Sequence, residues 1–300
     1  MGKYLFLFLL FVFASPTVSG SAKGQIFTGS GLVNIPTGAV LEHGVFAIGT
    51  YVAARMDETE VSYDVSVGHL TATSCFYLNF GLFDRVEVGL GHVWDEYGWN
   101  KYGRKLSTEQ AASLKVQLLK EQEVGAIPSI AIGIEYLGDG IVIRDSVGSQ
   151  SPSPFLAVSK TFNLPRIHQF SGHIGVGAQR FGFEERPFGL FFGLSKEFQP
   201  AFARGDITMS LEFDGAAVNA GMRYTISSGL QIALGAETLN NSDKLRYLAA
   251  VSWTNAPLLE KIDETQRLII QQATALRVAA KRAATKKKEV DKTTETPSSQ

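Results

Sequence analysis

The sequence predicts an all-β fold, an up-and-down antiparallel transmembrane β-barrel of about 12 strands followed by a C-terminal helical tail. Three observations support this prediction. Runs of alternating apolar and polar residues recur through residues 45–254, connections between them alternate between short and long, and the polar face carries isolated charges of both signs. The runs are about eight to eleven residues long, which is the length of a tilted strand that crosses a bilayer.

The stretch Cys75–Trp94 shows the alternation most clearly. Its first run places Phe76 and the next alternate apolar residues on one face, and Gly81–Asp84 then reverses the chain. The second run places Arg85 and Glu87 opposite an unbroken apolar row. Two alternating runs joined by a tight turn predict a β-hairpin. Taken alone, this hairpin fits a barrel between lipid and a polar lumen as well as it fits a soluble sheet with one wet face.

The remaining candidate strands repeat this pattern. We expect strands at Val45–Ala54, Thr73–Phe80, Arg85–Val93, Ala112–Leu119, Ile127–Tyr136, Pro154–Phe162, Phe170–Gln179, Phe188–Phe198, Asp206–Phe213, Ala217–Ile226, Leu230–Thr238 and Leu245–Trp253. Val61–Leu70 could add one more strand. The connections Arg55–Ala72, Trp94–Ala111 and Leu137–Ser153 are expected to be long polar loops, whereas their neighbours are short turns. Long loops gathered at one end are typical of outer-membrane barrels, and a soluble sandwich has no reason to place them there.

Charged residues fall on the face opposite the apolar rows. The lumen-lining candidates are Arg85, Glu87, Lys115, Glu135, Glu212, Arg223, Glu237 and Arg246. Between these charges the face is rich in Gly, Ala and Ser, which fits a narrow, partly filled lumen. Such a set could act as a selectivity lining or as ion-paired filling, and the balance of signs favours filling.

The N-terminal part of the chain divides into two stretches. Residues 1–22 read as a secretory signal peptide, because Lys3 precedes the apolar run Leu5–Ala14 and small residues follow it; a buried N-terminal helix is the alternative. Residues 23–44 are rich in Gly, Pro and Thr and are expected to form an extended periplasmic lead-in to the barrel at 45–254. The single cysteine excludes an internal disulfide.

Residues 255–300 differ in character from the rest of the chain. Pro257 suits the first turn of a helix, and apolar residues then recur at steps of three and four from Leu259 to Ala283. This spacing is that of a coiled-coil seam, weakened by Gln266. We expect a periplasmic helix, either solvated or bound through Leu259–Ala283 to a second copy or to a periplasmic or cell-wall partner. After it we expect a disordered basic tail.

No enzymatic motif is present. The sequence lacks a phosphate-binding loop, an HExxH motif, paired cysteines and a nucleophile elbow, and its five His and one Cys have no metal-ligand spacing. We therefore expect no catalytic residue, no metal, no cofactor and no nucleic-acid partner. His92 and His173 lie on strands at positions predicted to face inward, and we expect them to be ordinary hydrogen-bonded side chains.

Gly31–Ala39, with the sequence GLVNIPTGA, and the strand that follows it resemble the start of the YjbH-like outer-membrane proteins. Gly81–Gly89 and Asn219–Tyr224 resemble that family as well, and the similarity covers roughly Gly31–Trp253. The resemblance implies a barrel in the cell outer membrane that takes part in export or surface presentation of an extracellular polysaccharide. Its partners would be the lipid bilayer, lipopolysaccharide and the polysaccharide itself.

Two features depart from the resemblance. The better-known family members are much longer than this chain, and the basic helical tail is not a family feature. The family defines no catalytic residues, so none carry over. Two functions from other classes remain open from the residues alone: a passive channel for small solutes, and a structural barrel that anchors a periplasmic helix.

Overall fold

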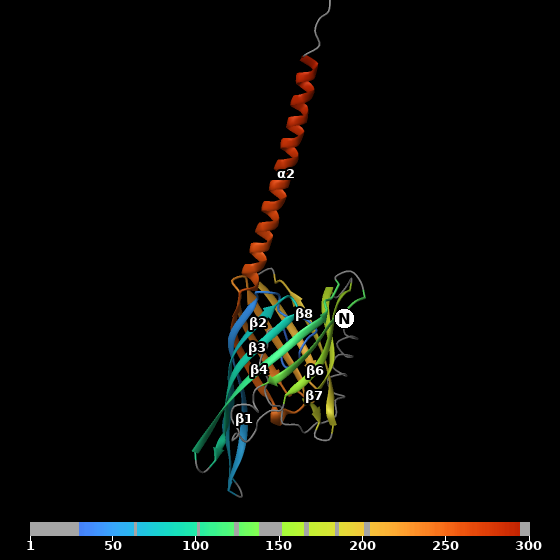
Figure 1. Ribbon diagram of the computed structural model, residues 1–300. Coiled ribbons are helices and arrows are strands. Elements are labelled where there is room, and N and C mark those ends of the chain that lie inside the picture. The colour runs from blue at the N-terminus through green and yellow to red at the C-terminus, as the bar shows by residue number, and fades with distance from the viewer. Residues whose placement is uncertain are drawn as a thin grey trace, which may run out of the picture. The chain divides into compact units, whose positions relative to one another are not determined.

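The computed structural model describes residues 30–62, 65–100, 103–122, 126–137, 152–164, 168–183, 186–200 and 205–294. Twelve antiparallel strands form a closed barrel in which each strand pairs with its neighbours along the chain, and β1 pairs with β12 to close it (Figure 1). This is the predicted up-and-down barrel. Closure leaves no strand edge unpaired, which a sheet surrounded by lipid requires.

All twelve predicted strands are present. Their bounds are β1 Phe46–Ser62, β2 Val65–Leu82, β3 Val86–Asn100, β4 Gly103–Leu119, β5 Ser129–Leu137, β6 Ser153–Leu164, β7 His168–Phe183, β8 Arg186–Phe198, β9 Gly205–Phe213, β10 Val218–Ile226, β11 Leu230–Glu237 and β12 Arg246–Thr254. A short 3₁₀ helix, η1 Ser242–Lys244, lies between β11 and β12, and the helix α2 Ala256–Thr294 follows β12.

The first four strands are longer than predicted. β1 and β2 stay paired from Phe46 with Phe80 out to Ser62 with Val65, so Arg55–Ala72 is a continued hairpin rather than a long loop. The same holds for Trp94–Ala111, where β3 and β4 stay paired as far as Asn100 and Gly103. Polarity alone does not distinguish a continued two-stranded ribbon from a loop, because backbone pairing does not require an apolar face. Val61–Leu70 contributes to β1 and β2 and adds no strand. The loop predicted at Leu137–Ser153 lies mostly outside the described residues.

Side chains alternate between the two faces of the barrel wall, except at register shifts such as the one between Ala178 and Phe183. The predicted apolar rows face outward, and large apolar side chains such as Phe76, Leu114, Ile132, Phe192 and Leu234 are exposed there. The intervening residues face inward and are buried, among them Tyr77, Glu87, Lys115 and Glu212. An apolar exterior around a polar interior is the reverse of a soluble barrel and fits a lipid surrounding.

A tight turn joins β2 to β3. The N–H of Arg85 donates to the carbonyl of Leu82 at 3.1 Å, and both central residues, Phe83 and Asp84, have positive φ angles of 55° and 53°. These are the features of a type I′ turn, whose twist matches that of the two strands. The end of the barrel at which this turn lies is called the turn end below, and β1 starts at the same end because Phe46 pairs with Phe80.

The chain forms two compact units, residues 1–255 and 256–300. In the second unit α2 begins with Ala256 and Pro257, as predicted, and continues to Thr294, so residues 284–294 are helical rather than disordered. Lysine is the commonest residue of this stretch and, with Ala284 and Glu289, is a strong helix former, which favours the extension. Among the described residues, no helix is long and apolar enough to cross a membrane.

Candidate functional site

A segment of the chain ahead of β1 lies inside the barrel. It comprises Ser30–Leu41, here called the luminal segment, and its residues 33–38 are all buried. We expected residues 23–44 to form a periplasmic lead-in. The part of that stretch from 30 to 41 instead lies against inward-facing side chains of the wall, while residues 1–29, with the predicted signal peptide, lie outside the described residues.

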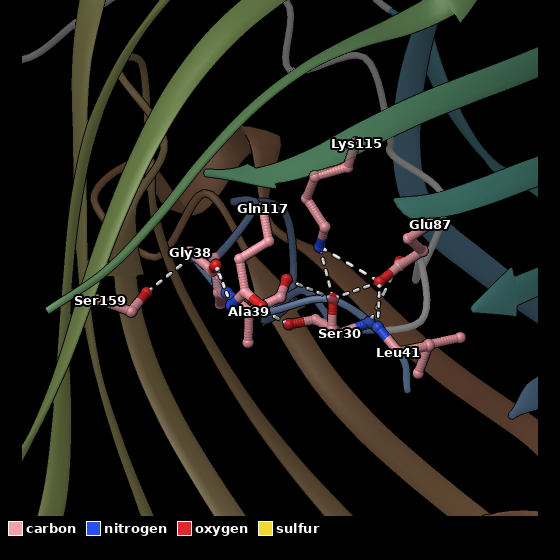
Figure 2. Close-up of polar contacts among 9 residues, drawn as sticks. Ser30, Gly38, Ala39, Leu41, Glu87, Lys115, Gln117 and Ser159 are labelled. Carbon is pink, nitrogen blue, oxygen red and sulfur yellow. Dashed lines mark hydrogen bonds and ion pairs between the residues drawn. The ribbon is translucent and has the colours of Figure 1, made fainter. Parts of the chain in front are cut away.

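Both ends of the luminal segment meet at one carboxylate, that of Glu87 on β3 (Figure 2). The hydroxyl of Ser30 donates to Glu87 Oε2 at 2.5 Å, and the N–H of Leu41 donates to the same oxygen at 3.0 Å. Lys115 on the adjacent strand β4 lies 3.4 Å from this oxygen and also donates to the Ser30 hydroxyl. Glu87 and Lys115 were both predicted to line the lumen, and here they hold the neck of a loop.

The middle of the luminal segment is held by neutral polar groups. The N–H of Gly38 donates to the Ser159 hydroxyl at 2.8 Å, and its carbonyl accepts from the Gln117 amide at 3.0 Å (Figure 2). A Cβ atom at position 38 would lie 2.5 Å from the carbonyl oxygen of Ser129. Only glycine fits here, because the backbone of the segment touches the backbone of β5.

The tip of the luminal segment is held by Glu212, the second-to-last residue of β9. Its carboxylate accepts from the backbone N–H groups of Val33 at 3.0 Å, Asn34 at 2.5 Å and Ile35 at 3.4 Å. The Asn219 amide donates to Glu212 at 3.2 Å and to Asp214 at 2.9 Å. An extended tip exposes unpaired backbone donors, and the buried carboxylate satisfies them.

Arg180 on β7 makes a further polar contact with the tip. Its guanidinium donates to the carbonyl of Asn34 at 2.8 Å and pairs with Glu135 at 2.5 Å. Sequence alternation did not reveal Arg180, because the β7–β8 register shifts between Ala178 and Phe183 and Gln179 has a φ of 56°. Such a bulge changes which residues face inward, and alternation alone does not show where it occurs.

Apolar side chains of the luminal segment fill two groups of aromatic rings on different parts of the wall. Val33 packs into a cluster with Tyr51 and Tyr77 on β1 and β2. Ile35, with Leu32, packs against a second cluster that contains Phe155, Phe181 and Phe191, on β6, β7 and β8. Wall glycines make room for these contacts: a Cβ at Gly221 would lie 2.5 Å from Val33 Cγ2, and a Cβ at Gly193 would lie 2.8 Å from Ile35 Cδ1.

The other predicted lumen residues lie as follows. Glu237 and Arg246 face each other across β11 and β12 at 3.6 Å, and Arg246 also donates to Thr73 at 3.1 Å. Arg223 is half-buried on β10, on the same face as Gly221. Arg85 is misplaced by the prediction, because it is exposed in the turn and donates to the carbonyl of Leu118 at 3.3 Å. The strand was expected to start at Arg85, but β3 starts at Val86, so Arg85 belongs to the turn and does not follow the alternation of the strand.

His173 lies in the interior wall between two hydroxyl groups. Its Nδ1 is 2.7 Å from Ser159 Oγ, and its Nε2 is 3.0 Å from Ser195 Oγ. Because both ring nitrogens contact serines, no carboxylate orients the ring as in a Ser-His-Asp triad. Among the described residues, no group of three or more His, Cys, Asp or Glu is placed to hold a metal ion. The polar interior of this barrel binds its own N-terminal segment.

A closed antiparallel barrel with an apolar exterior and a polar, largely ion-paired interior has the architecture of an outer-membrane β-barrel protein. The sequence model of the YjbH family, described as "Exopolysaccharide biosynthesis protein YbjH", matches residues 24–245. The chain belongs to this family, as the resemblance indicated. No curated protein matches the chain by sequence.

Solved structures of two outer-membrane proteins are remotely similar to the chain. One is an outer membrane channel from Pseudomonas putida F1, with 11% identity, a TM-score of 0.45 and coverage of 77% of this chain and 100% of that one. The other is the toluene transporter TbuX from Ralstonia pickettii, with 9% identity, a TM-score of 0.36 and coverage of 73% of this chain and 90% of that one.

Proposed function

We propose that this outer-membrane barrel takes part in the export or surface presentation of an extracellular polysaccharide, without catalysing a reaction itself. The observation that carries this proposal is membership of a family described as exopolysaccharide biosynthesis proteins over residues 24–245. The filled lumen fits the proposal, because a barrel that handles a polymer on demand must otherwise stay closed to small solutes.

The test is a deletion of the gene in its native host. We expect the amount of polysaccharide on the cell surface to fall while the intracellular sugar precursors remain, and we expect the full chain to restore it. A matched control is the same chain with Val88→Arg on the outer face, which should fail to assemble and fail to restore the polymer. Unchanged polysaccharide in the deletion strain would contradict the proposal.

A passive channel for small solutes is the second candidate function. The barrel fold supports it, but the luminal segment counts against it, because residues 33–38 are buried within the interior. Planar bilayers separate the two candidates. A steady ohmic current from the purified wild-type chain would favour the passive channel, and the absence of current would count against it.

A structural barrel that anchors a helix is the third candidate. We infer that the turn end and α2 lie on the periplasmic side, since short turns face the periplasm in outer-membrane barrels. The lipid bilayer and lipopolysaccharide would then surround the barrel, and Leu259–Ala283 would be free to bind a second copy or a periplasmic or cell-wall partner. Several apolar side chains of this helix, such as Ile269 and Leu276, are exposed.

A truncation tests the helix, and the structure shows where to make it. The Asn255 side chain accepts from the N–H of Phe46 at 2.8 Å and donates to the carbonyl of Gly44 at 2.9 Å, so Asn255 belongs to the barrel. The chain should therefore end after Asn255. If the envelope phenotype and the proteins that co-purify stay unchanged, the helix is not essential; loss of either with a correctly folded barrel supports an anchoring role.

A further inference from the structure

The luminal segment covers aromatic rings that project inward from two parts of the wall. Tyr51 and Tyr77 lie beneath Val33, and Phe155, Phe181 and Phe191 lie beneath Ile35, all of them buried. Barrel interiors can be filled by aliphatic side chains from the wall alone. Here the wall instead presents flat rings to a segment that comes from elsewhere in the chain.

Polar acceptors lie on the same inward surface. Glu212 holds the tip of the luminal segment through the contacts described above, and the Asn219 amide donates to Glu212. Asn79 faces inward two residues after Tyr77 and is only 1% exposed, yet neither atom of its side-chain amide has a hydrogen-bond partner in the described part of the chain. A buried amide without a partner indicates a polar surface whose hydrogen-bonding capacity the protein does not use up.

The luminal segment is attached in a way that permits it to leave. No described residue from 30 to 44 belongs to a strand of the barrel, so the ladder closes without it. Its two described ends, Ser30 and Leu41, meet at Glu87 near the turn end, so residues 30–41 form one loop whose ends lie together. Withdrawal would break side-chain contacts and would leave every strand pair intact.

We propose that the inward surface beneath the luminal segment is a saccharide-binding surface, and that the segment is a displaceable plug that covers it. This proposal rests on the proposed polysaccharide function and deepens it. Aromatic rings pack on the apolar C–H faces of sugar rings, while carboxylate and amide oxygens accept from sugar hydroxyls. Much of the charge on this surface is neutralised, because Lys115, Arg180 and Arg246 are paired with Glu87, Glu135 and Glu237, and this favours neutral sugars. Arg223 is a further cation on the inward face of β10.

The first experiment removes the plug and keeps the wall. Residues 31–40 are replaced by a Gly/Ser linker of equal length in the full chain, and folding is checked by heat-modifiable migration. In planar bilayers we expect the wild type to be closed and the linker variant to carry a steady current. Should the linker variant fail to fold, Val33→Ser combined with Ile35→Ser removes both apolar contacts with a smaller change. Equal currents in the wild type and the folded variant would contradict the proposal that the luminal segment plugs the barrel.

The second experiment probes the surface with maltohexaose, a neutral linear oligosaccharide. We expect it to reduce the current of the linker variant in a concentration-dependent way. Phe191→Ala in that background should weaken the block about fivefold, the effect of losing one ring contact. The matched control is Phe192→Ala, because Phe191 is 0% exposed inside the barrel and the next residue, Phe192, is 42% exposed outside it. The proposal that this surface binds saccharide would be contradicted if maltohexaose did not change the current, or if Phe191→Ala and Phe192→Ala had equal effects on the block.

A cross-link tests the movement itself. A Cβ at Gly221 would lie 2.5 Å from Val33 Cγ2, so a Val33→Cys/Gly221→Cys pair has its Cβ atoms at most about 4 Å apart, within the range of a disulfide. We expect polysaccharide at the cell surface to be lost with the disulfide formed and to return on reduction, with Gly221→Cys alone as control. Normal polysaccharide in the oxidised cross-linked strain would overturn displacement. The bilayer results do not depend on the host phenotype, so failure of the proposed function and failure of this proposal are distinguishable.

Discussion

The carboxylate of Glu212 accepts a hydrogen bond of 2.5 Å from the backbone N–H of Asn34, a residue 178 positions earlier in the chain. The same carboxylate accepts from the N–H groups of Val33 and Ile35. A single inward-facing glutamate on β9 thus satisfies three consecutive backbone donors of a segment that forms no strand. The balance of inward charges in the sequence favoured ion-paired filling of the lumen, and in the structure Glu87, Lys115 and Glu212 also hold this segment.

Glu212→Ala should loosen the tip of the luminal segment. Three backbone donors would lose their acceptor in a buried place, which costs about 1–3 kcal/mol for an unsatisfied group. We expect a lower thermal midpoint of unfolding in detergent and faster proteolysis within residues 30–41. Glu197→Gln, a change at an exposed glutamate on β8, serves as control and should alter neither measurement. Equal stability of Glu212→Ala and wild type would show that the tip is held by its apolar contacts alone.

Glu87 and Lys115 should behave as a coupled pair. Removing either partner leaves the other charge buried at the neck of the luminal segment, and breaking a buried pair costs about 3–5 kcal/mol. The double variant Glu87→Gln/Lys115→Met should therefore be more stable than the sum of the single changes indicates. A double-mutant cycle on the free energy of unfolding measures this coupling. Additive effects would mean that each side chain acts independently through Ser30.

Val88→Arg should impair assembly of the barrel. Val88 lies on the outer face of β3, paired with Phe80 and Leu114, both exposed apolar residues. An arginine facing lipid costs about 2–4 kcal/mol at the middle of the membrane and less towards the interfaces. Val88 is the third residue of β3 near the turn end, so we expect a smaller cost than the full mid-membrane value. Folding yield into lipid vesicles, read from heat-modifiable migration, measures the effect, and Val88→Leu is the control. If the Val88→Arg and Val88→Leu chains fold with equal yield, the assignment of Val88 to the lipid-facing side of β3 is wrong.

Phe83→Asn should stabilise the β2–β3 turn. A non-glycine residue in the left-handed region costs about 1–2 kcal/mol, and asparagine tolerates that region better than phenylalanine. Part of the gain will be offset because Phe83 stacks on His43, with ring centroids 5.9 Å apart. Phe83→Val should destabilise the turn, since a branched side chain fits a positive φ poorly. The midpoint of urea unfolding compares the variants, and a lower midpoint for asparagine than for valine would refute this account.

Glu121, in the connection between β4 and β5, should make the stability of the protein depend on pH in the acidic range. Burial raises the pKa of Glu121, but hydrogen bonds from the N–H and hydroxyl of Thr161 and the pairing with Lys160 outweigh it, so the pKa lies below its ordinary value of 4.5. A carboxyl group with a lowered folded-state pKa contributes stability above its unfolded-state pKa and loses it as pH falls through the folded-state value. Glu121→Gln should therefore lose less stability than wild type between pH 5 and about 3. Parallel pH curves of the two chains would contradict this prediction.

Much of the fold followed from local pattern. Alternation along Phe76–Phe80 and Val86–Leu90 separates the two faces of the hairpin, because strand geometry places successive side chains on opposite faces, and the pattern of the whole chain then assigns the apolar face to lipid. Neighbouring strands joined by short turns then leave the up-and-down order as the simplest closure. The polarity of Arg55–Ala72 misled the prediction, since the backbone of β1 and β2 stays paired through this stretch although its sequence is polar.

The sequence by itself determined the strands, their order, the outward apolar face and the inward position of seven of the eight charged candidates, all except Arg85. Only the tertiary structure decided what those charges do. The contacts that hold the luminal segment and its surroundings join residues far apart in the sequence: Ser30 with Glu87, Asn34 with Glu212, and Arg180 with Glu135. No local spacing in the sequence predicts contacts of this kind. The physical reason is that the luminal segment has no periodicity of its own. Its position depends on buried backbone donors that find acceptors only once the barrel around them has closed.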